Sequence, residues 1–344
     1  MSKRLAEFDL IRAGTALAVV AIHVTAGYMD LSLGYICNHL VRFAVPLFIV
    51  ISGFLLYWTD QGNPFVPTRQ FYQKRLHKIL GPYVIWTCLY CLLNFYLLRL
   101  SSPWLFLTTL GNSLLWGNAY YHLYFLIIIL QLYLLYPFLR NWMLRSARSL
   151  LGASLLISGT VQILLYLYLL GVITLPARYS LLYVRAFPVW LFYFVFGMYA
   201  AAQFMKTRPK ETGLSPALVL WMVSLIIMLL DSKLSGIQGS IVRPSVMLYA
   251  IASYYFFYAL ARSSGPGKGL WIGWLSAQSF LIYLMHPLVM TSLTILTRHL
   301  GYPSLWTGSQ GMLLFYGATV AITIMATYLV SRTPLANILG GVRT

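Results

Sequence analysis

The sequence contains few charged residues, and acidic residues are the scarcest of them. Only 9% of its 344 residues are charged, and six are aspartate or glutamate, whereas about a quarter of the residues of a soluble domain are charged. Hydrophobic residues make up 60% of the chain. A water-soluble domain of this size has too much surface to cover with so few charges. The composition therefore excludes such a domain and indicates a membrane protein.

The sequence also lacks the segments of about ten residues, alternating apolar and polar, that form the strands of membrane barrels. It contains instead apolar runs of about twenty residues, the length a helix needs to cross roughly 30 Å of hydrocarbon. We therefore predict an all-α fold, a bundle of about ten transmembrane helices. The predicted spans are residues 8–29, 37–58, 79–99, 120–139, 149–170, 185–205, 214–231, 243–261, 270–297 and 311–330.

Basic residues outnumber acidic residues by 24 to six, which gives a net charge of +18. In a soluble protein this charge would suggest a nucleic-acid partner, but here the basic residues gather in every second connection between the apolar runs. Sixteen lie on one side of the predicted bundle and six on the other, the asymmetry expected from the positive-inside rule. We therefore predict that both termini are cytoplasmic and that no nucleic acid is bound. The sixteen are Lys3, Arg4, Arg69, Lys74, Arg75, Lys78, Arg140, Arg145, Arg148, Lys206, Arg208, Lys210, Arg262, Lys268, Arg332 and Arg343.

No connection between the predicted spans is long enough to hold a separate soluble domain. The longest connections lie near residues 59–78 and 100–119. The sequence shows no repeat of fixed period, and its charged start does not resemble a cleavable signal peptide. We predict one transmembrane domain over residues 1–344.

Cysteine is scarce, and the motifs of several familiar sites are missing. The CxxC pair Cys88 and Cys91 lies in an apolar run without other ligands, so we interpret it, like Cys37, as packing thiols. The sequence has no HExxH pair, Walker glycine loop, GxSxG elbow or dinucleotide fingerprint. We therefore predict no metal cofactor.

The first predicted span contains ionisable residues, which are costly inside a membrane and by default mark a functional site. Arg12 and His23 are eleven residues apart, so in a helix they share a face and lie about 16 Å apart along its axis. This arrangement suits a long ligand with its anionic end at the arginine and its reactive end at the histidine. The alternative is an arginine that snorkels to the interface and a histidine that bonds a neighbouring helix.

His23 is the best candidate for a general base, because imidazole titrates near neutral pH. A base of this kind needs a partner that orients its ring. Asp30 lies seven residues after His23, on nearly the same face but about 10 Å further along the helix axis. Asp9 is more distant. A tyrosine or serine hydroxyl from another helix is the alternative, and the sequence does not choose between them.

A basic cluster precedes the third predicted span and contains Arg69, Lys74, Arg75, His77 and Lys78. We take its arginines and lysines as the candidate cofactor-binding residues. Three interpretations fit it: binding of anionic lipid head groups, fixing of the membrane orientation, or binding of the phosphates of a cofactor.

Three further residues are candidates for substrate binding. His122 lies in an aromatic segment at the outer end of the fourth span, and His286 precedes Pro287 in the middle of the ninth. Arg42 lies in the outer part of the second span. Two of them have a simpler alternative: a hydrogen bond to a neighbouring helix for His286, and snorkelling for Arg42. An interfacial aromatic belt explains the tyrosines beside His122 but not His122 itself.

Together these segments resemble acyltransferase family 3, the integral membrane acyltransferases that modify cell-surface carbohydrates and related acceptors. The resemblance covers most of the chain in order. It rests on Phe8-Asp9-Leu10-Ile11-Arg12 with His23 in Arg-x10-His spacing, on VPLFIVISGFLL, on FYQKRLHKILGPY, on YHLYFL with Tyr124 where tryptophan is usual, and on SFLIYLMHP.

The resemblance implies a ten-helix core in which acyl-CoA approaches from the cytoplasm and its acyl group passes to an acceptor on the outer side. It implies that Arg12 and His23 form the essential pair, and we group Asp9 of the same signature with them as a candidate catalytic residue. It also implies that Arg75 and Lys78 hold the CoA phosphates. Lys78 replaces the family's second arginine, so a bidentate grip is lost there.

We therefore predict an acyl-CoA-dependent O-acyltransferase, with acetyl-CoA as the expected donor, in the inner membrane of a bacterium. The chain resembles the short members that act on enterobacterial common antigen or poly-N-acetylglucosamine, which points to a surface or lipid-linked glycan as acceptor. The alternatives are a polysaccharide or lipid-linked sugar exporter and a structural subunit of a glycan synthase. The expected partners are acyl-CoA, the glycan and membrane lipids, and an oligomer is compatible with the sequence.

Overall fold

The computed structural model describes residues 5–61, 68–176, 179–206, 213–263 and 270–344. Over these residues it contains helices and no strand, and ten helical segments are long and apolar enough to cross a membrane. All ten predicted spans are therefore confirmed, and the chain is a multi-pass helical membrane protein. Six basic residues used for the orientation prediction, Lys3, Arg4, Arg178, Arg208, Lys210 and Lys268, lie outside the described residues.

The membrane-length segments are built from twelve helices and one short turn. They are α1 (Ala6–Thr25) with η1 (Ala26–Tyr28), α2 (Ser32–Leu40) with α3 (Ala44–Gln61), α4 (Thr68–Leu97), α6 (Tyr124–Arg145), α7 (Ala147–Leu169), α8 (Leu182–Arg185) with α9 (Phe187–Lys206), α10 (Leu214–Ser235), α11 (Pro244–Ser263), α12 (Leu270–His299) and α13 (Gly308–Ser331).

The second span is interrupted and not simply kinked. The sequence predicted one continuous span over residues 37–58, but the helix ends at Leu40 and resumes at Ala44. Pro46 therefore lies in the first turn of α3, where a missing backbone N–H breaks no helical hydrogen bond. The interruption places Arg42 in the three-residue gap between the two helices.

The two longest connections are also more helical than predicted. Helix α4 begins at Thr68, so most of the basic cluster lies on its first three turns. The connection near 100–119 contains α5 (Pro103–Trp116), which the Ser102 hydroxyl caps by accepting from the Leu105 amide. With 14 residues α5 is about 21 Å long, too short to cross the bilayer.

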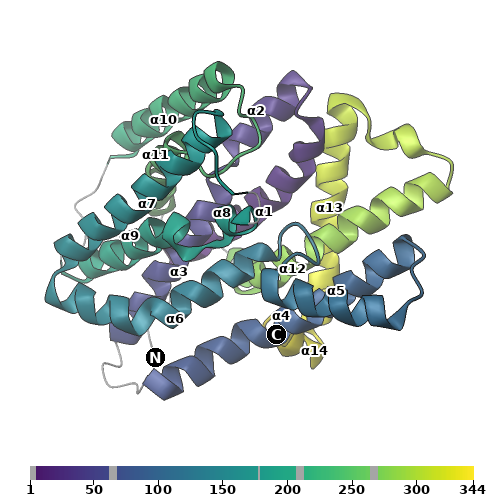
Figure 1. The fold of residues 1–344 in the computed structure, drawn as a ribbon, viewed down its shortest axis with the longest axis horizontal. Coiled ribbons are helices and arrows are strands. Elements are labelled where there is room, and N and C mark those ends of the chain that lie inside the picture. Colours follow the sequence, from purple (N-terminus) through teal and green to yellow (C-terminus); the bar gives the residue numbers. More distant parts are fainter. Residues whose placement is uncertain (1–4, 62–67, 177–178, 207–212, 264–269) are drawn as a thin grey trace.

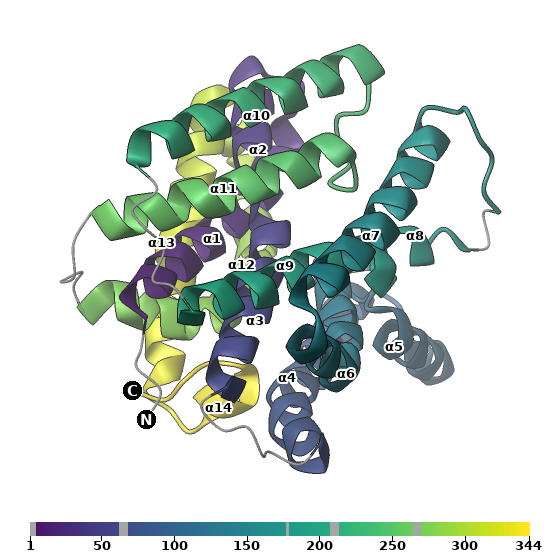
Figure 2. The same ribbon diagram turned by 90° about the vertical axis from the view of Figure 1, so that its left-hand side faces the viewer.

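Helices α3 and α9 pack closely at the centre of the bundle, with α7 on the far side of α9 (Figures 1 and 2). Two glycines permit this approach. A Cβ atom on Gly53 would lie 2.1 Å from the Phe194 carbonyl oxygen, and one on Gly197 would lie 2.0 Å from that of Val50. Small residues at such crossings are typical of membrane helices.

Helices α1 and α12 run side by side in the same direction. This is expected because they form the first and the ninth span, and all odd-numbered spans cross the membrane in the same direction. Their contacts progress together along both helices: Asp9 meets Ser276, Arg12 meets Ser279, and the rings of His23 and His286 stack. Arg12 and His23 therefore share the face of α1 that packs on α12, as their spacing predicted.

The two ends of the described chain lie at the same end of the bundle. Leu5 and Thr344 line one cavity, and the short helix α14 (Leu335–Leu339) packs on the middle of α4, where the Trp86 indole donates to the Leu339 carbonyl at 3.0 Å. Buried Gln278 fastens the last residues of the chain, because its side chain donates to the Val342 carbonyl at 2.6 Å and accepts from the Val342 amide at 3.0 Å.

Candidate active site

A cavity of about 750 Å³ opens at the end of the bundle where α1 begins, and we call it the Arg12 cavity. Helices α1, α3, α4, α6 and α12 form its walls. Its polar lining consists of Asp9, Arg12, Ser52, Thr59, Arg75, Lys78, Tyr133, Ser276, Ser279, Tyr283 and Thr344. With three cations and one carboxylate among its described residues, this lining favours an anionic ligand.

Hydrogen bonds fix the polar side chains of the Arg12 cavity. The Arg12 guanidinium donates to the Ser279 hydroxyl at 3.1 Å, and the Ser276 hydroxyl donates to the Asp9 carboxylate at 2.7 Å. Arg75 donates to the Thr59 hydroxyl at 3.0 Å. These bonds hold the two arginines in the walls and leave Lys78 as an exposed cation at the same cavity.

The structure separates the predicted cofactor-binding residues into two groups. Arg75 and Lys78 line the Arg12 cavity together with Arg12 from α1. Arg69 and Lys74 lie on the first two turns of the same helix, but they are exposed and do not line the cavity. Of the four, Arg75 and Lys78 are therefore the residues that a ligand in the Arg12 cavity would meet.

Three histidines from three segments meet deeper in the bundle. The His23 ring of α1 lies 5.3 Å from that of His286 on α12, and the His286 ring lies 5.6 Å from that of His122, which immediately precedes α6. The sequence predicted each of them separately as a candidate, and the fold brings them together. We call them the histidine cluster.

The histidine cluster contains ring nitrogens that lack hydrogen-bond partners among the described residues. Both nitrogens of His122 and Nε2 of His286 are buried and have no such partner. Nδ1 of His286 lies 3.3 Å from the Ile282 carbonyl oxygen. Unpaired buried polar atoms are costly, so the cluster has unused capacity to bond a substrate or pass a proton.

His23 has ring neighbours but no carboxylate partner among the described residues. Its ring lies 4.7 Å from that of Tyr121, whose hydroxyl points to the Met290 sulfur at 3.7 Å. Asp9 is bonded to Ser276 at the Arg12 cavity, and Asp30 lies exposed beyond η1. Neither predicted carboxylate therefore orients His23; its neighbours are an imidazole and a phenol ring.

Burial controls the ionisation of the residues that precede α6. It lowers the pKa of His122 well below its ordinary value, and nearby His286 and His23 add to the decrease. Burial also raises the pKa of the Tyr121 phenol. His122 is therefore a neutral imidazole at physiological pH, able to donate one hydrogen bond and accept another.

A thin aromatic layer separates the Arg12 cavity from the histidine cluster. Phe125 and Tyr283 line the deep part of the cavity, and their rings lie 5.4 Å apart. The Tyr283 ring also lies 5.2 Å from that of His122, and its hydroxyl donates to the His122 carbonyl. One layer of side chains thus lies between the cationic cavity and the imidazoles.

A second cavity of about 610 Å³ lies on the other side of His23, and we call it the His23 cavity. Its polar lining consists of His23, Asn38, Arg42, Tyr121, Tyr124, Ser180, Arg185 and Ser240. His23 also lines a smaller neighbouring cavity of about 520 Å³, together with Asp30 and Trp306. The imidazole of His23 is therefore accessible from the side opposite to the Arg12 cavity.

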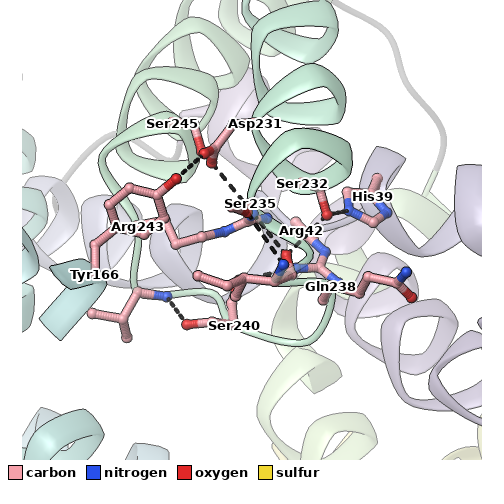
Figure 3. Close-up of polar contacts among 12 residues, drawn as sticks. His39, Arg42, Tyr166, Asp231, Ser232, Ser235, Gln238, Ser240, Arg243 and Ser245 are labelled. Carbon is pink, nitrogen blue, oxygen red and sulfur yellow. Dashed lines mark hydrogen bonds and ion pairs between the residues drawn. The ribbon is translucent and has the colours of Figure 1, made fainter. Parts of the chain in front are cut away.

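Arg42 is buried and belongs to a polar network, so it does not snorkel. It is 1% exposed and donates to the carbonyls of Gln238 and Ser240 and to the Asn38 side chain, the last two at 2.9 Å. Figure 3 shows how Arg42 and Arg243 together hold the segment between α10 and α11. Arg243 in turn donates to the Ile237 carbonyl and pairs with Asp231 at 3.3 Å.

Several residues of these cavities carry no signal in the sequence. Ser276, Ser279 and Asn38 are small polar residues of apolar helices, and nothing in their spacing separates them from packing residues. Arg185 is one of the six basic residues on the opposite side of the predicted bundle, where membrane orientation explains it. Its position in the wall of the His23 cavity depends on the short helix α8 and the turn before α9.

The described residues do not contain a group of three or more histidine, cysteine, aspartate or glutamate side chains that could hold a metal ion. The imidazoles of the histidine cluster are arranged as stacked and edge-on rings. Each imidazole of the cluster can donate or accept a hydrogen bond and can transfer a proton.

Comparison with known proteins gives one finding. The sequence-family model for the acyltransferase domain of acyltransferase family 3 matches residues 5–332, nearly the whole chain. Neither the curated proteins nor the solved structures gave a match. The extent of the family match and the ten membrane-length helices agree with each other. The chain belongs to acyltransferase family 3 and is a membrane acyltransferase.

Proposed function

We propose that the protein is an O-acetyltransferase that moves an acetyl group from cytoplasmic acetyl-CoA to a hydroxyl of a surface or lipid-linked glycan in the bacterial inner membrane. The observation that carries this proposal is the position of His23. It lies between a cationic cavity on one side and a second cavity on the other. A transferase whose donor and acceptor come from opposite sides of a membrane needs this arrangement.

The donor occupies the Arg12 cavity in this proposal. Arg75 and Lys78 bind the phosphates of CoA at the mouth, and Arg12 adds positive charge further inside. The extended pantetheine arm runs along α1 towards His23, which lies about 16 Å beyond Arg12 along the helix axis. Asp9 and Arg12 thus act at the donor end, where Asp9 holds Ser276 in the cavity wall by accepting a hydrogen bond from its hydroxyl.

The reaction takes place where the aromatic layer meets the histidine cluster. His23 removes the proton from the acceptor hydroxyl, and the oxygen attacks the thioester carbonyl. The carbon–oxygen bond forms, the carbon–sulfur bond breaks, and the thiolate takes up a proton to leave as CoA. His286 stacks on His23 and can accept or return the proton. The products are the acetyl ester and free CoA, so atoms and charge balance.

A small acyl group fits this geometry better than a long one. Tyr283 lies in the cavity wall and within 6.2 Å, centroid to centroid, of the His286 ring. Of the acyl groups, acetyl needs the least room beside these two rings. The resemblance to short family members that act on exported glycans supports the same donor and acceptor classes.

The proposal is tested by acetyl transfer in membrane vesicles that contain lipid-linked glycans. Radiolabelled acetyl-CoA is supplied to the wild type, to His23→Ala and to His77→Ala, a matched control in which an exposed histidine of α4 is removed. We expect ester-linked label with the wild type and with His77→Ala, and none with His23→Ala. Transfer that persists in His23→Ala would contradict the role of the base. Absence of acetyl-CoA binding and of transfer in the wild type would favour the exporter instead.

A further inference from the structure

The His23 cavity is positively charged, and its described lining contains no aspartate or glutamate. Arg42 and Arg185 lie in its wall together with the imidazole of His23. The other polar groups are neutral donors and acceptors. The lining therefore differs from that of the smaller neighbouring cavity, which contains Asp30 and no arginine or lysine among its described residues.

Arg185 has an unused donor in this cavity. Nη1 of its guanidinium is buried and has no hydrogen-bond acceptor among the described residues. Its backbone is fixed, because the Arg185 carbonyl accepts from Gln131 at 2.8 Å and the same glutamine accepts from the Phe187 amide at 3.0 Å. A buried guanidinium nitrogen without an acceptor is costly unless a ligand supplies one.

Arg42 has a second unused donor, and it is coupled to α1 beside the base. Its Nε is buried without a partner among the described residues. Its other two nitrogens donate to the Asn38 side chain and to the carbonyls of Gln238 and Ser240, and Figure 3 shows the last two residues beside Arg42. Asn38, which accepts from Arg42, donates to the Ile22 carbonyl at 3.0 Å. The Arg42 guanidinium is therefore held in a fixed relation to the residue that precedes His23.

We propose that the His23 cavity binds an acceptor that carries a negative charge, a carboxylate or a phosphate, close to the hydroxyl that is acylated. The inference rests on the proposed function and specifies the class of its acceptor. The oxygens of the anion accept from the guanidinium groups of Arg185 and Arg42, which suit carboxylates and phosphates. The acceptor hydroxyl then lies against His23.

The remaining lining suits a sugar ring attached to this anion. Tyr121 and Tyr124 offer aromatic faces and hydroxyls, and Ser180 and Ser240 offer further polar groups. A neutral glycan would leave the two guanidinium donors unsatisfied, so the site selects against it by the cost of unpaired buried groups.

The test measures the affinity of three related sugars for the purified protein in nanodiscs of zwitterionic lipid. Glucose is the neutral probe, glucuronate supplies a carboxylate, and glucose 1-phosphate supplies a phosphate. We expect at least one of the two anions to bind roughly tenfold or more tightly than glucose, the factor that one charge-assisted hydrogen bond contributes. The tighter of the two anions identifies the group.

Variants of Arg185 test whether the preference for anionic sugars arises in the His23 cavity. Arg185→Gln should reduce the preference for the anion to about the level of glucose, and Arg185→Lys should retain most of it because the charge remains. Arg298→Gln is the matched control. Arg298 is an exposed arginine near the C-terminal end of α12 and does not line the cavity. Equal binding of all three sugars to the wild type, or an unchanged preference in Arg185→Gln, would overturn the inference.

Acetyl-CoA binding is measured on the same samples, which separates this inference from the proposed function. If the wild type and Arg185→Gln bind acetyl-CoA equally but no anion is preferred, the acceptor class is wrong and the acyltransferase proposal stands. If the wild type does not bind acetyl-CoA, the proposed function itself fails.

Discussion

At the scale of single residues, the contact between His23 and His286 supports the proposal that His23 acts as a base without a carboxylate beside it. The two rings are stacked at 5.3 Å, and Nε2 of His286 has no partner among the described residues. A second imidazole can take up the proton that the first removes. We expect His286→Asn to lower the rate of acetyl transfer by roughly 10²-fold, the lower end of the range for a proton-transfer group. Acetyl-CoA affinity should stay unchanged, and a parallel loss of affinity would show that His286 supports the donor site instead.

Arg75 supplies the sharpest test of the donor site. Arg75→Ala should raise the acetyl-CoA dissociation constant roughly tenfold, because one charge-assisted contact to a phosphate is lost. Arg69→Ala is the control, since Arg69 is exposed on the same helix outside the Arg12 cavity. Binding is measured by equilibrium dialysis with labelled acetyl-CoA. Equal losses in both variants would mean that the basic cluster acts only through its general charge.

His122 makes stability depend on pH in a predictable direction. Its pKa is lowered on folding, so between that lowered value and about 6.5 the unfolded chain binds a proton that the folded protein does not. Stability contributed by the neutral ring is present above about pH 6.5 and decreases as the pH falls, by at most about 1.4 kcal/mol per pH unit. We expect Tm in detergent to fall between pH 7.5 and 5.5, and to fall less in His122→Gln. An equal fall in both proteins would exclude His122 as the source.

At the scale of helices, the crossing of α3 and α9 depends on two glycines. A Cβ atom on Gly197 would lie 2.0 Å from a backbone oxygen of α3, so Gly197→Ala must push the helices apart. Overpacking of this kind costs about 1–3 kcal/mol. Gly152→Ala in α7 is the matched control, because nothing lies within 4 Å of the added Cβ. Thermal unfolding of both variants should show a lower Tm only for Gly197→Ala.

The helices also show what the sequence could and could not predict. Runs of apolar residues identified all ten spans, because length and hydropathy are set by the bilayer itself. The break before α3 and the helix α5 were not predicted: residues 37–58 were predicted as one span, and the 100–119 segment as a connection between spans. Both depend on packing against other helices, which a single segment does not encode.

The candidate residues were predicted better than their partners. His23, His122 and His286 were selected because ionisable residues are rare within spans. Their meeting required the order of helices in space, and so did the pairing of Asp9 with Ser276 and of Arg12 with Ser279. Arg42 was selected for the same reason as the histidines, yet much of its hydrogen bonding is structural.

At the scale of the whole molecule, the account requires that the Arg12 cavity opens to the cytoplasm. Charge asymmetry predicts this orientation, and cysteine labelling tests it. In a variant without Cys37, Cys88 and Cys91, single cysteines at exposed Lys74 and at exposed Tyr302 report the two ends of the bundle. A membrane-impermeant maleimide applied to intact cells whose outer membrane has been made permeable should label position 302 and spare position 74. The reverse pattern would place the donor site on the wrong side.

The central claim is that donor binding and acyl transfer occur at two separate places joined by α1. The most direct measurement combines acetyl-CoA binding and CoA release on the same purified sample in nanodiscs with an acceptor glycan, for the wild type and His23→Ala. The account predicts that His23→Ala binds acetyl-CoA with the affinity of the wild type and releases CoA at least roughly 10²-fold more slowly. Release at the wild-type rate, or loss of binding together with release, would contradict it.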